Sequence, residues 1–144
     1  MHNRLTQFQP TPLKGTAILV TSRPYRAKTL QQATRFALQG WREAWCTQPN
    51  LRVHLCAATG AMLLGVRCRL SLTEWLWVAF AIGLVVFAEL MNTAIEQTVD
   101  LVVGLRPDPL ARRVKDVSAG CVLVAALIAV VVGGFTFLPH LLWR

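Results

Sequence analysis

The sequence predicts an all-α membrane protein with one N-terminal amphipathic surface helix and three transmembrane helices. Hydrophobic residues make up 54% of its 144 residues and charged residues 15%, whereas charged residues make up roughly 25% of an ordinary globular chain. Most basic residues gather in two groups, and the long stretches outside them are nearly free of charge. Because a span needs about 20 apolar residues, this length accommodates three spans at most beside a tail.

The net charge of +8 does not indicate a nucleic-acid-binding protein. Eight of the 15 basic residues precede residue 53, and four more lie between Arg106 and Lys115. Basic groups that flank apolar spans are typical of membrane proteins and tend to stay inside the cell. A nucleic-acid-binding domain would spread its basic residues over a soluble fold, and no zinc-finger, homeodomain or RNA-recognition pattern is visible. We therefore exclude nucleic acid as a partner.

The N-terminal part divides into a tail and a surface helix. Residues 1–25 carry three prolines among scattered polar residues and predict a flexible cytoplasmic tail, so residues 26–144 form the membrane domain. Between about 28 and 47, apolar residues that include two tryptophans recur at helical spacing, with charged residues between them. This pattern is typical of a helix that lies in the membrane interface. Pro49 disfavours helical geometry at the preceding residue and is expected to end this helix.

Three spans are expected after the surface helix. The first covers about residues 51–66 and the second about 73–103, with a capping box over Ser71–Glu74 that opens the second helix. The second helix is longer than a bilayer needs, so its last turns should project into the cytoplasm. A basic loop over Gly104–Arg113 precedes the third span, at about 115–143. The positions of the basic groups place the N-terminus inside and the C-terminus outside.

The second span carries a stripe of polar residues that points to chemistry. Glu89, Asn92, Glu96 and Asp100 are spaced by three, four and four residues, so they lie on one side of a helix. Carboxylates are expensive in hydrocarbon and mark functional positions by default. A solvated face at the protruding end of the helix would explain Asp100 and even Glu96. It does not explain Glu89, which directly follows an apolar run.

Phosphoryl transfer suits this stripe and the loop after it. A deep carboxylate can act as a base on a group that resides in the membrane, and Glu96, two turns nearer the cytoplasm, can hold Mg²⁺. The loop residues Arg112, Arg113 and Lys115 can hold phosphate oxygens. These are the parts that phosphoryl transfer needs. No Walker A motif or kinase-type glycine-rich loop occurs in the sequence, so we exclude a soluble kinase fold.

A non-catalytic or proton-relaying membrane subunit is the alternative. Intramembrane carboxylates also mark ion paths, and the basic loop would then bind anionic lipid headgroups. The coexistence of a carboxylate at base depth, another at metal depth and a phosphate-binding loop favours the kinase. Transfer of label from γ-labelled ATP into lipid separates the two hypotheses.

The ordered motifs resemble those of one family, the small prokaryotic integral-membrane diacylglycerol and undecaprenol kinases. The resemblance covers about residues 30–143, and its core is Glu89-x-x-Asn92-Thr-Ala-Ile-Glu96-x-x-Val-Asp100. Three further motifs accompany this core: Ala111-Arg-Arg-Val-Lys115-Asp116-Val-Ser-Ala-Gly120, Gly40-Trp-Arg42-x-Ala-Trp45 and Asn50-Leu-Arg52-Val-His54. Their order and spacing make the resemblance specific.

The resemblance implies a homotrimer in a bacterial inner membrane, with active sites shared between neighbouring subunits. It implies MgATP as phosphoryl donor and a membrane lipid alcohol as acceptor. Glu89 would be the catalytic base and Asn92 its supporting polar group. The residues implied for nucleotide and metal binding are Glu96, Lys115, Asp116, Asp108, Arg112, Arg113, Phe36 and Gln48, with Glu96 as metal ligand and Gln48 as a weak second one. The residues implied on the lipid side, besides Glu89, are Trp45, Arg52 and Gly40.

Two positions depart from the family's pattern. Gln48 stands where the family usually has a second metal carboxylate, so the site loses a charge that favours Mg²⁺. Asp108 occupies a place in the loop where a histidine is common. The segments Asn50–His54 and Lys115–Val122 look closer to the undecaprenol kinase branch. We therefore favour undecaprenol over diacylglycerol as the acceptor.

Overall fold

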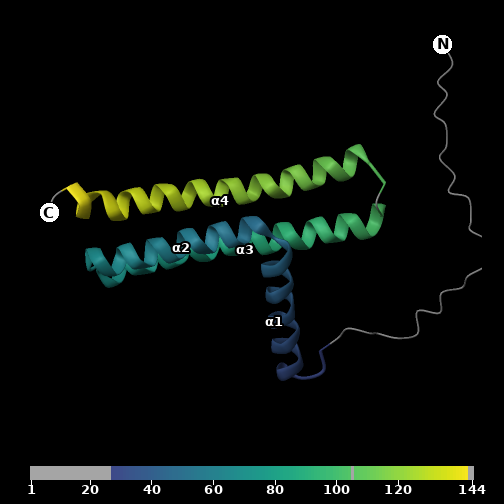
Figure 1. The fold of residues 1–144 in the computed structure, drawn as a ribbon, viewed down its shortest axis with the longest axis horizontal. Coiled ribbons are helices and arrows are strands. Elements are labelled where there is room, and N and C mark those ends of the chain that lie inside the picture. Colours follow the sequence, from purple (N-terminus) through teal and green to yellow (C-terminus); the bar gives the residue numbers. More distant parts are fainter. Residues whose placement is uncertain (1–26, 105, 143–144) are drawn as a thin grey trace, which may run out of the picture.

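The computed structural model describes residues 27–104 and 106–142, and the predicted tail over residues 1–25 lies outside the described residues. These residues form four helices: α1 (Leu30–Thr47), α2 (Pro49–Cys68), α3 (Leu72–Val103) and α4 (Pro109–Leu142). The three longer helices run side by side, and α1 lies across them near the start of α2 (Figure 1). The all-α prediction is confirmed.

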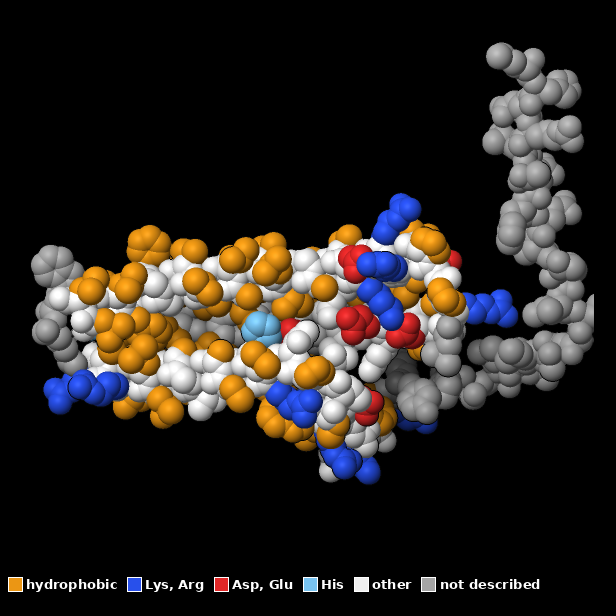
Figure 2. Space-filling model, turned by 45° about the horizontal axis from the view of Figure 1, so that its top comes forward, with side chains coloured by type: hydrophobic (Ala, Val, Ile, Leu, Met, Phe, Trp, Pro, Cys, Tyr) orange, Lys and Arg blue, Asp and Glu red, His pale blue; other side chains and the backbone are white. Residues whose placement is uncertain are grey.

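Helices α2, α3 and α4 are each long and apolar enough to cross a membrane, which confirms three candidate spans. The 32 residues of α3 extend ~48 Å at 1.5 Å per residue, well beyond a hydrocarbon core of about 30 Å. The paired ends of α3 and α4 extend past the level of α1 (Figure 1). Charged side chains gather at this end and over α1, while the visible middle of the bundle is largely apolar or uncharged (Figure 2).

The junction between α1 and α2 is a single residue with extended backbone, Gln48. Helix α1 ends at Thr47, as the following proline predicted, but the chain re-enters a helix at once, with Pro49 in the first turn of α2. Proline suits this position because its fixed φ is helical and the missing N–H has no partner there. Helix α2 therefore begins two residues before the start of the predicted span.

The connection between α2 and α3 is tight. Arg69 adopts a left-handed backbone conformation, with φ of 55°, and ends α2. The Ser71 N–H and hydroxyl both donate to Glu74 Oε2 at 2.7 Å, and the Glu74 N–H reaches Ser71 Oγ at 3.4 Å. The capping box is therefore present as predicted. Cys68, Leu70 and Val78 form a small apolar core behind this turn.

Gly65 permits this close approach of α2 and α3. A Cβ atom at this position would lie 2.7 Å from Trp75 Cη2, whereas a Cβ at Gly60 would meet nothing within 4 Å. We predict that Gly65→Ala destabilises the fold by about 1–3 kcal/mol, the usual cost of overpacking. Gly60→Ala is the matched control and should be neutral or stabilising, since alanine favours a helix. Reversible unfolding in mixed micelles measures both variants, and equal stabilities would contradict the prediction.

The loop between α3 and α4 is shorter than expected. Helix α4 begins at Pro109, so the second half of the predicted loop Gly104–Arg113 is helical. Asp108 causes the early start because its Oδ1 accepts hydrogen bonds from the Leu110 and Ala111 N–H groups, at 2.7 and 2.9 Å. An aspartate followed by proline is a strong helix-initiation signal. The third span was predicted from the apolar run alone, so the earlier start of the helix was not expected.

One face of α3 packs against α2 and α4 along its length. Its buried residues follow helical spacing and change from apolar to polar toward the α3–α4 loop: Val78, Ala81, Val85, Glu89, Asn92 and Thr93. The polar stripe is thus continuous with the apolar packing face of the helix. At the opposite end of the bundle, His140 Nε2 lies 2.7 Å from Glu74 Oε1 and links α4 to the start of α3.

Candidate functional site

Glu89 lies at the centre of the candidate site. It is only 2% exposed, because it continues the buried face of α3. Its Oε1 lies 3.2 Å from Nε2 of His54, a half-buried residue on α2. The two groups form an ion pair when the imidazole ring is protonated.

The depth of this pair follows from helical rise. His54 is the sixth residue of α2, which places it ~7 Å along the helix from the α1–α2 junction. Glu96 follows Glu89 by seven residues on α3, or ~10 Å toward the α3–α4 loop. Because Glu89 contacts His54, Glu89 and Glu96, two of the three carboxylates of the stripe, lie on opposite sides of the level where α1 joins the bundle.

Asn92 connects the stripe to α4. Its Nδ2 donates to Glu96 Oε1 at 3.1 Å, and its Oδ1 accepts from the Ser118 hydroxyl at 2.6 Å. Asn92 and Ser118 are both buried, so these bonds satisfy polar groups that water does not reach. The amide thereby fixes the orientation of the Glu96 carboxylate. Asn92 contacts Glu96 and Ser118 rather than Glu89, so the supporting role toward Glu89 that the resemblance implied stays a prediction.

A second group of predicted site residues surrounds a hollow at the α3–α4 loop. The hollow measures about 690 Å³. Its charged lining residues are Asp100, Arg106, Asp108, Arg112, Lys115 and Asp116. Lys115 Nζ is held by Asp100 Oδ1 at 2.6 Å. Four of the residues predicted to contact nucleotide therefore share one concave surface, although Asp108 also has the structural role of capping α4.

The other predicted residues do not join these two clusters. Phe36, Gly40 and Trp45 are exposed on α1, and a Cβ at Gly40 would meet nothing within 4 Å. Arg52 is exposed near the start of α2, and Arg113 is exposed on α4 outside the lining of the hollow. The lipid-side roles of Gly40, Trp45 and Arg52 therefore stay predictions, as do the nucleotide-side roles of Phe36 and Arg113.

No role was predicted from the sequence for three residues that contribute contacts to the site. These residues are His54, Ser118 and Asp100, the last of which binds Lys115. His54 and Ser118 both lie in motifs that resemble those of the family, but neither motif suggested a role for them. An ionisable side chain in the second turn of an apolar helix was the available signal for His54. The contacts of Ser118 and Lys115 depend on how α3 and α4 align, which spacing within one helix does not give.

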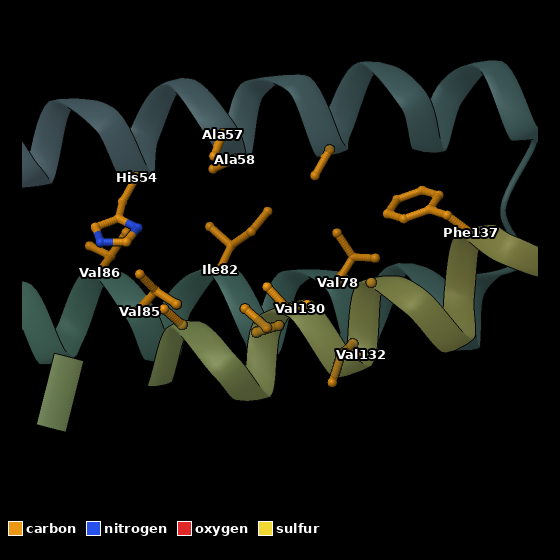
Figure 3. A pocket seen from close by; sticks show the side chains of 15 residues that line it. His54, Ala57, Ala58, Val78, Ile82, Val85, Val86, Val130, Val132 and Phe137 are labelled. Carbon is orange, nitrogen blue, oxygen red and sulfur yellow. The ribbon is translucent and has the colours of Figure 1, made fainter. Parts of the chain in front are cut away.

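An apolar cavity of about 310 Å³ extends from His54 between α2, α3 and α4. Figure 3 shows the ring at one end of this space and Phe137 at the other, with aliphatic side chains between them. Among the described residues that line the cavity, His54 alone is polar. The histidine that contacts the buried carboxylate therefore borders a space suited to hydrocarbon rather than to water.

The donor set fits Mg²⁺ only in part. Mg²⁺ is usually held by one or two carboxylates together with substrate phosphates and water, and the half-buried Glu96, oriented by Asn92, supplies one such carboxylate. Gln48 is half-buried at the α1–α2 junction and offers an amide oxygen. Within the described ranges, no group of three or more His, Cys, Asp or Glu side chains lies close enough to hold an ion. A cation here would therefore depend on phosphate oxygens.

Comparison with known proteins agrees with this geometry. The model of the prokaryotic diacylglycerol kinase family matches residues 35–137. The chain is 34% identical to the diacylglycerol kinase of Synechocystis sp., covering 99% of this chain and 87% of the relative. It is 41% identical to the undecaprenol kinase of Bacillus subtilis, covering 66% and 76%. It is 27% identical to the diacylglycerol kinase of Escherichia coli, covering 69% and 81%.

Proposed function

We propose, from the premise that the chain belongs to the prokaryotic diacylglycerol kinase family, that it phosphorylates undecaprenol in preference to diacylglycerol. Membership confirms the resemblance drawn from the motifs and makes the chain a membrane lipid kinase with ATP as co-substrate. The alternative of a non-catalytic or proton-relaying subunit is therefore set aside.

The placement of Glu89 carries the proposed mechanism. The carboxyl group is buried and contacts His54, which lines the apolar cavity between α2, α3 and α4. A lipid whose chain occupied this cavity would present its hydroxyl near Glu89. Glu89 accepts the hydroxyl proton as the acceptor oxygen bonds to the γ-phosphorus and the bond from that phosphorus to the bridging oxygen of ADP breaks.

The remaining residues position and neutralise the nucleotide. Lys115 and Arg112 line the hollow at the α3–α4 loop and would hold phosphate oxygens, as a point charge and a planar fork respectively. Glu96, with Gln48 as a weak second ligand, would hold Mg²⁺, which supplies charge neutralisation on the transferred phosphoryl group when it is bound. Asn92 keeps Glu96 in place.

The preference for undecaprenol is proposed from the segments Asn50–His54 and Lys115–Val122 and from 41% identity over 95 residues to the undecaprenol kinase of B. subtilis. Identity to the diacylglycerol kinases of Synechocystis sp. and E. coli is 34% over 152 residues and 27% over 100 residues. The decisive experiment presents both lipids side by side in one mixed-micelle assay with γ-labelled ATP. We expect a higher kcat/KM for undecaprenol. A higher value for diacylglycerol would overturn the preference, and no transfer to either lipid would overturn the function.

We also propose that the N-terminus and the α3–α4 loop lie in the cytoplasm and the C-terminus outside. In a background without the four native cysteines, Arg106→Cys should resist a membrane-impermeant thiol reagent in intact cells and react after permeabilisation. Leu72→Cys, at the opposite end of the bundle, should react in intact cells. The reverse pattern would place the nucleotide hollow in the wrong compartment.

A homotrimer is the proposed assembly. An apolar groove of about 390 Å³ runs along α3 and α4, and Asn92 and Ser118 of the site network line it. A neighbouring copy packed in this groove would cover the network and add residues to the site, as the family resemblance implies. Native mass spectrometry from detergent should give three copies, whereas a fully active monomer would contradict the assembly.

A further inference from the structure

We propose that His54 is a positioning residue for the lipid kinase reaction, which holds one oxygen of Glu89 so that the other faces the acceptor hydroxyl. The inference rests on the proposed role of Glu89 as base. It comes from the 3.2 Å contact between His54 Nε2 and Glu89 Oε1, which joins α2 to α3. The sequence motifs gave His54 no role.

Because the Glu89 carboxyl group is buried, it needs a polar partner within the protein. The Glu89 side chain is only 3% exposed, whereas that of His54 is 27% exposed. A buried carboxylate without a hydrogen-bond partner carries a large desolvation cost. Within the part of the chain that the structure describes, His54 is the group that contacts the Glu89 carboxyl: the Thr93 hydroxyl bonds instead to the Glu89 main-chain carbonyl, at 2.9 Å.

The surroundings offer no replacement for the ring. The neighbouring side chains from α3 and α4 that line the cavity beside His54 are aliphatic, including Val85, Val86 and Ala126. The ring points from α2 toward Val85 and Val86 on α3 (Figure 3). The nearest carboxylate along the stripe, Glu96, is already engaged by Asn92. Loss of the ring would therefore leave the Glu89 carboxyl group free to rotate among rotamers.

The contact also gives the two carboxyl oxygens of Glu89 different roles. Because Oε1 faces His54 Nε2 at 3.2 Å, proton abstraction falls to Oε2. A base must lie within hydrogen-bond reach of the proton it removes, so fixing one oxygen aligns the other. Loss of this positioning by His54 is therefore expected to lower kcat. The residues that line the nucleotide hollow at the α3–α4 loop would stay unchanged.

Two amide substitutions test the proposal without a large change in polarity or size. The glutamine of His54→Gln extends about as far as Nε2 and can donate to Oε1, whereas the asparagine of His54→Asn ends near the position of Nδ1 and cannot. We expect His54→Asn to lower kcat by about tenfold or more, with the KM for ATP within about twofold of wild type. His54→Gln should retain most of the turnover. Equal turnover in the two variants, or a change confined to KM, would overturn the proposal.

A double-mutant cycle separates this inference from the function on which it rests. In a Glu89→Gln background, His54→Asn should cost less than about twofold, because the group that it positions is no longer a base. Full additivity of the two effects would overturn the positioning role. If Glu89→Gln alone left turnover unchanged, the proposed base would be wrong, whereas a large loss for Glu89→Gln with none for His54→Asn would refute only the role of His54.

Discussion

Glu89→Gln is expected to lower kcat by about 10²–10⁴-fold, the range that general-base catalysis contributes. The substitution keeps the shape of a side chain that is 2% exposed and keeps an oxygen that can accept a hydrogen bond from His54. It removes the negative charge and with it the ability to take up a proton. The KM for ATP should stay near the wild-type value, because the nucleotide hollow is lined by other residues. Steady-state kinetics with saturating lipid measure both constants.

Glu43→Gln is the matched control for this variant. Glu43 is exposed on α1, and the same change of charge there should leave turnover within about twofold, as is usual for a surface substitution. Thermal unfolding in detergent should be similar for both variants. Near-normal turnover of Glu89→Gln would refute the role of base, and a parallel fall in both variants would attribute the loss to net charge.

Local signals in the sequence predicted the helices well. The capping box over Ser71–Glu74 and the proline after α1 act within a few residues, so their outcome does not depend on the rest of the fold. The early start of α4 was also a local event, controlled by Asp108 and Pro109, and was missed because the apolar run was used to define the third helix. The apolar run reports membrane exposure, whereas the helix begins where its first N–H groups are capped.

The candidate site was predictable along one helix but not between helices. The 3.6-residue period placed Glu89, Asn92 and Glu96 on one side of α3, as the structure has them. The contacts that complete the site join different helices: His54 from α2 and Ser118 from α4. Their partners depend on the axial shift and rotation of each helix, which packing of many side chains sets together. Periodicity within a single helix contains no information on either quantity.

The metal site gives the second large effect, because Glu96 is the only carboxylate proposed at its depth. Glu96→Gln should abolish turnover or raise the Mg²⁺ concentration for half-maximal activity by about tenfold or more. The Gln side chain can still accept the hydrogen bond from Asn92 Nδ2, which is 3.1 Å from Glu96 Oε1, so the network should persist. Titration of Mg²⁺ at fixed ATP, with removal by a chelator as the zero point, measures the change.

Gln48→Glu provides the opposite test at the same site. If Gln48 is a poor second ligand, a carboxylate there adds the charge that the family pattern normally supplies, and half-maximal activity should need less Mg²⁺. Gln48 lies at the α1–α2 junction, where it makes no side-chain cap to α2, so the substitution removes no helix-capping bond. An unchanged titration would mean that Gln48 only joins the two helices, and Glu96 would then act with phosphate oxygens and water alone. If neither substitution shifts the Mg²⁺ dependence, both residues are excluded as ligands and the cation must bind elsewhere.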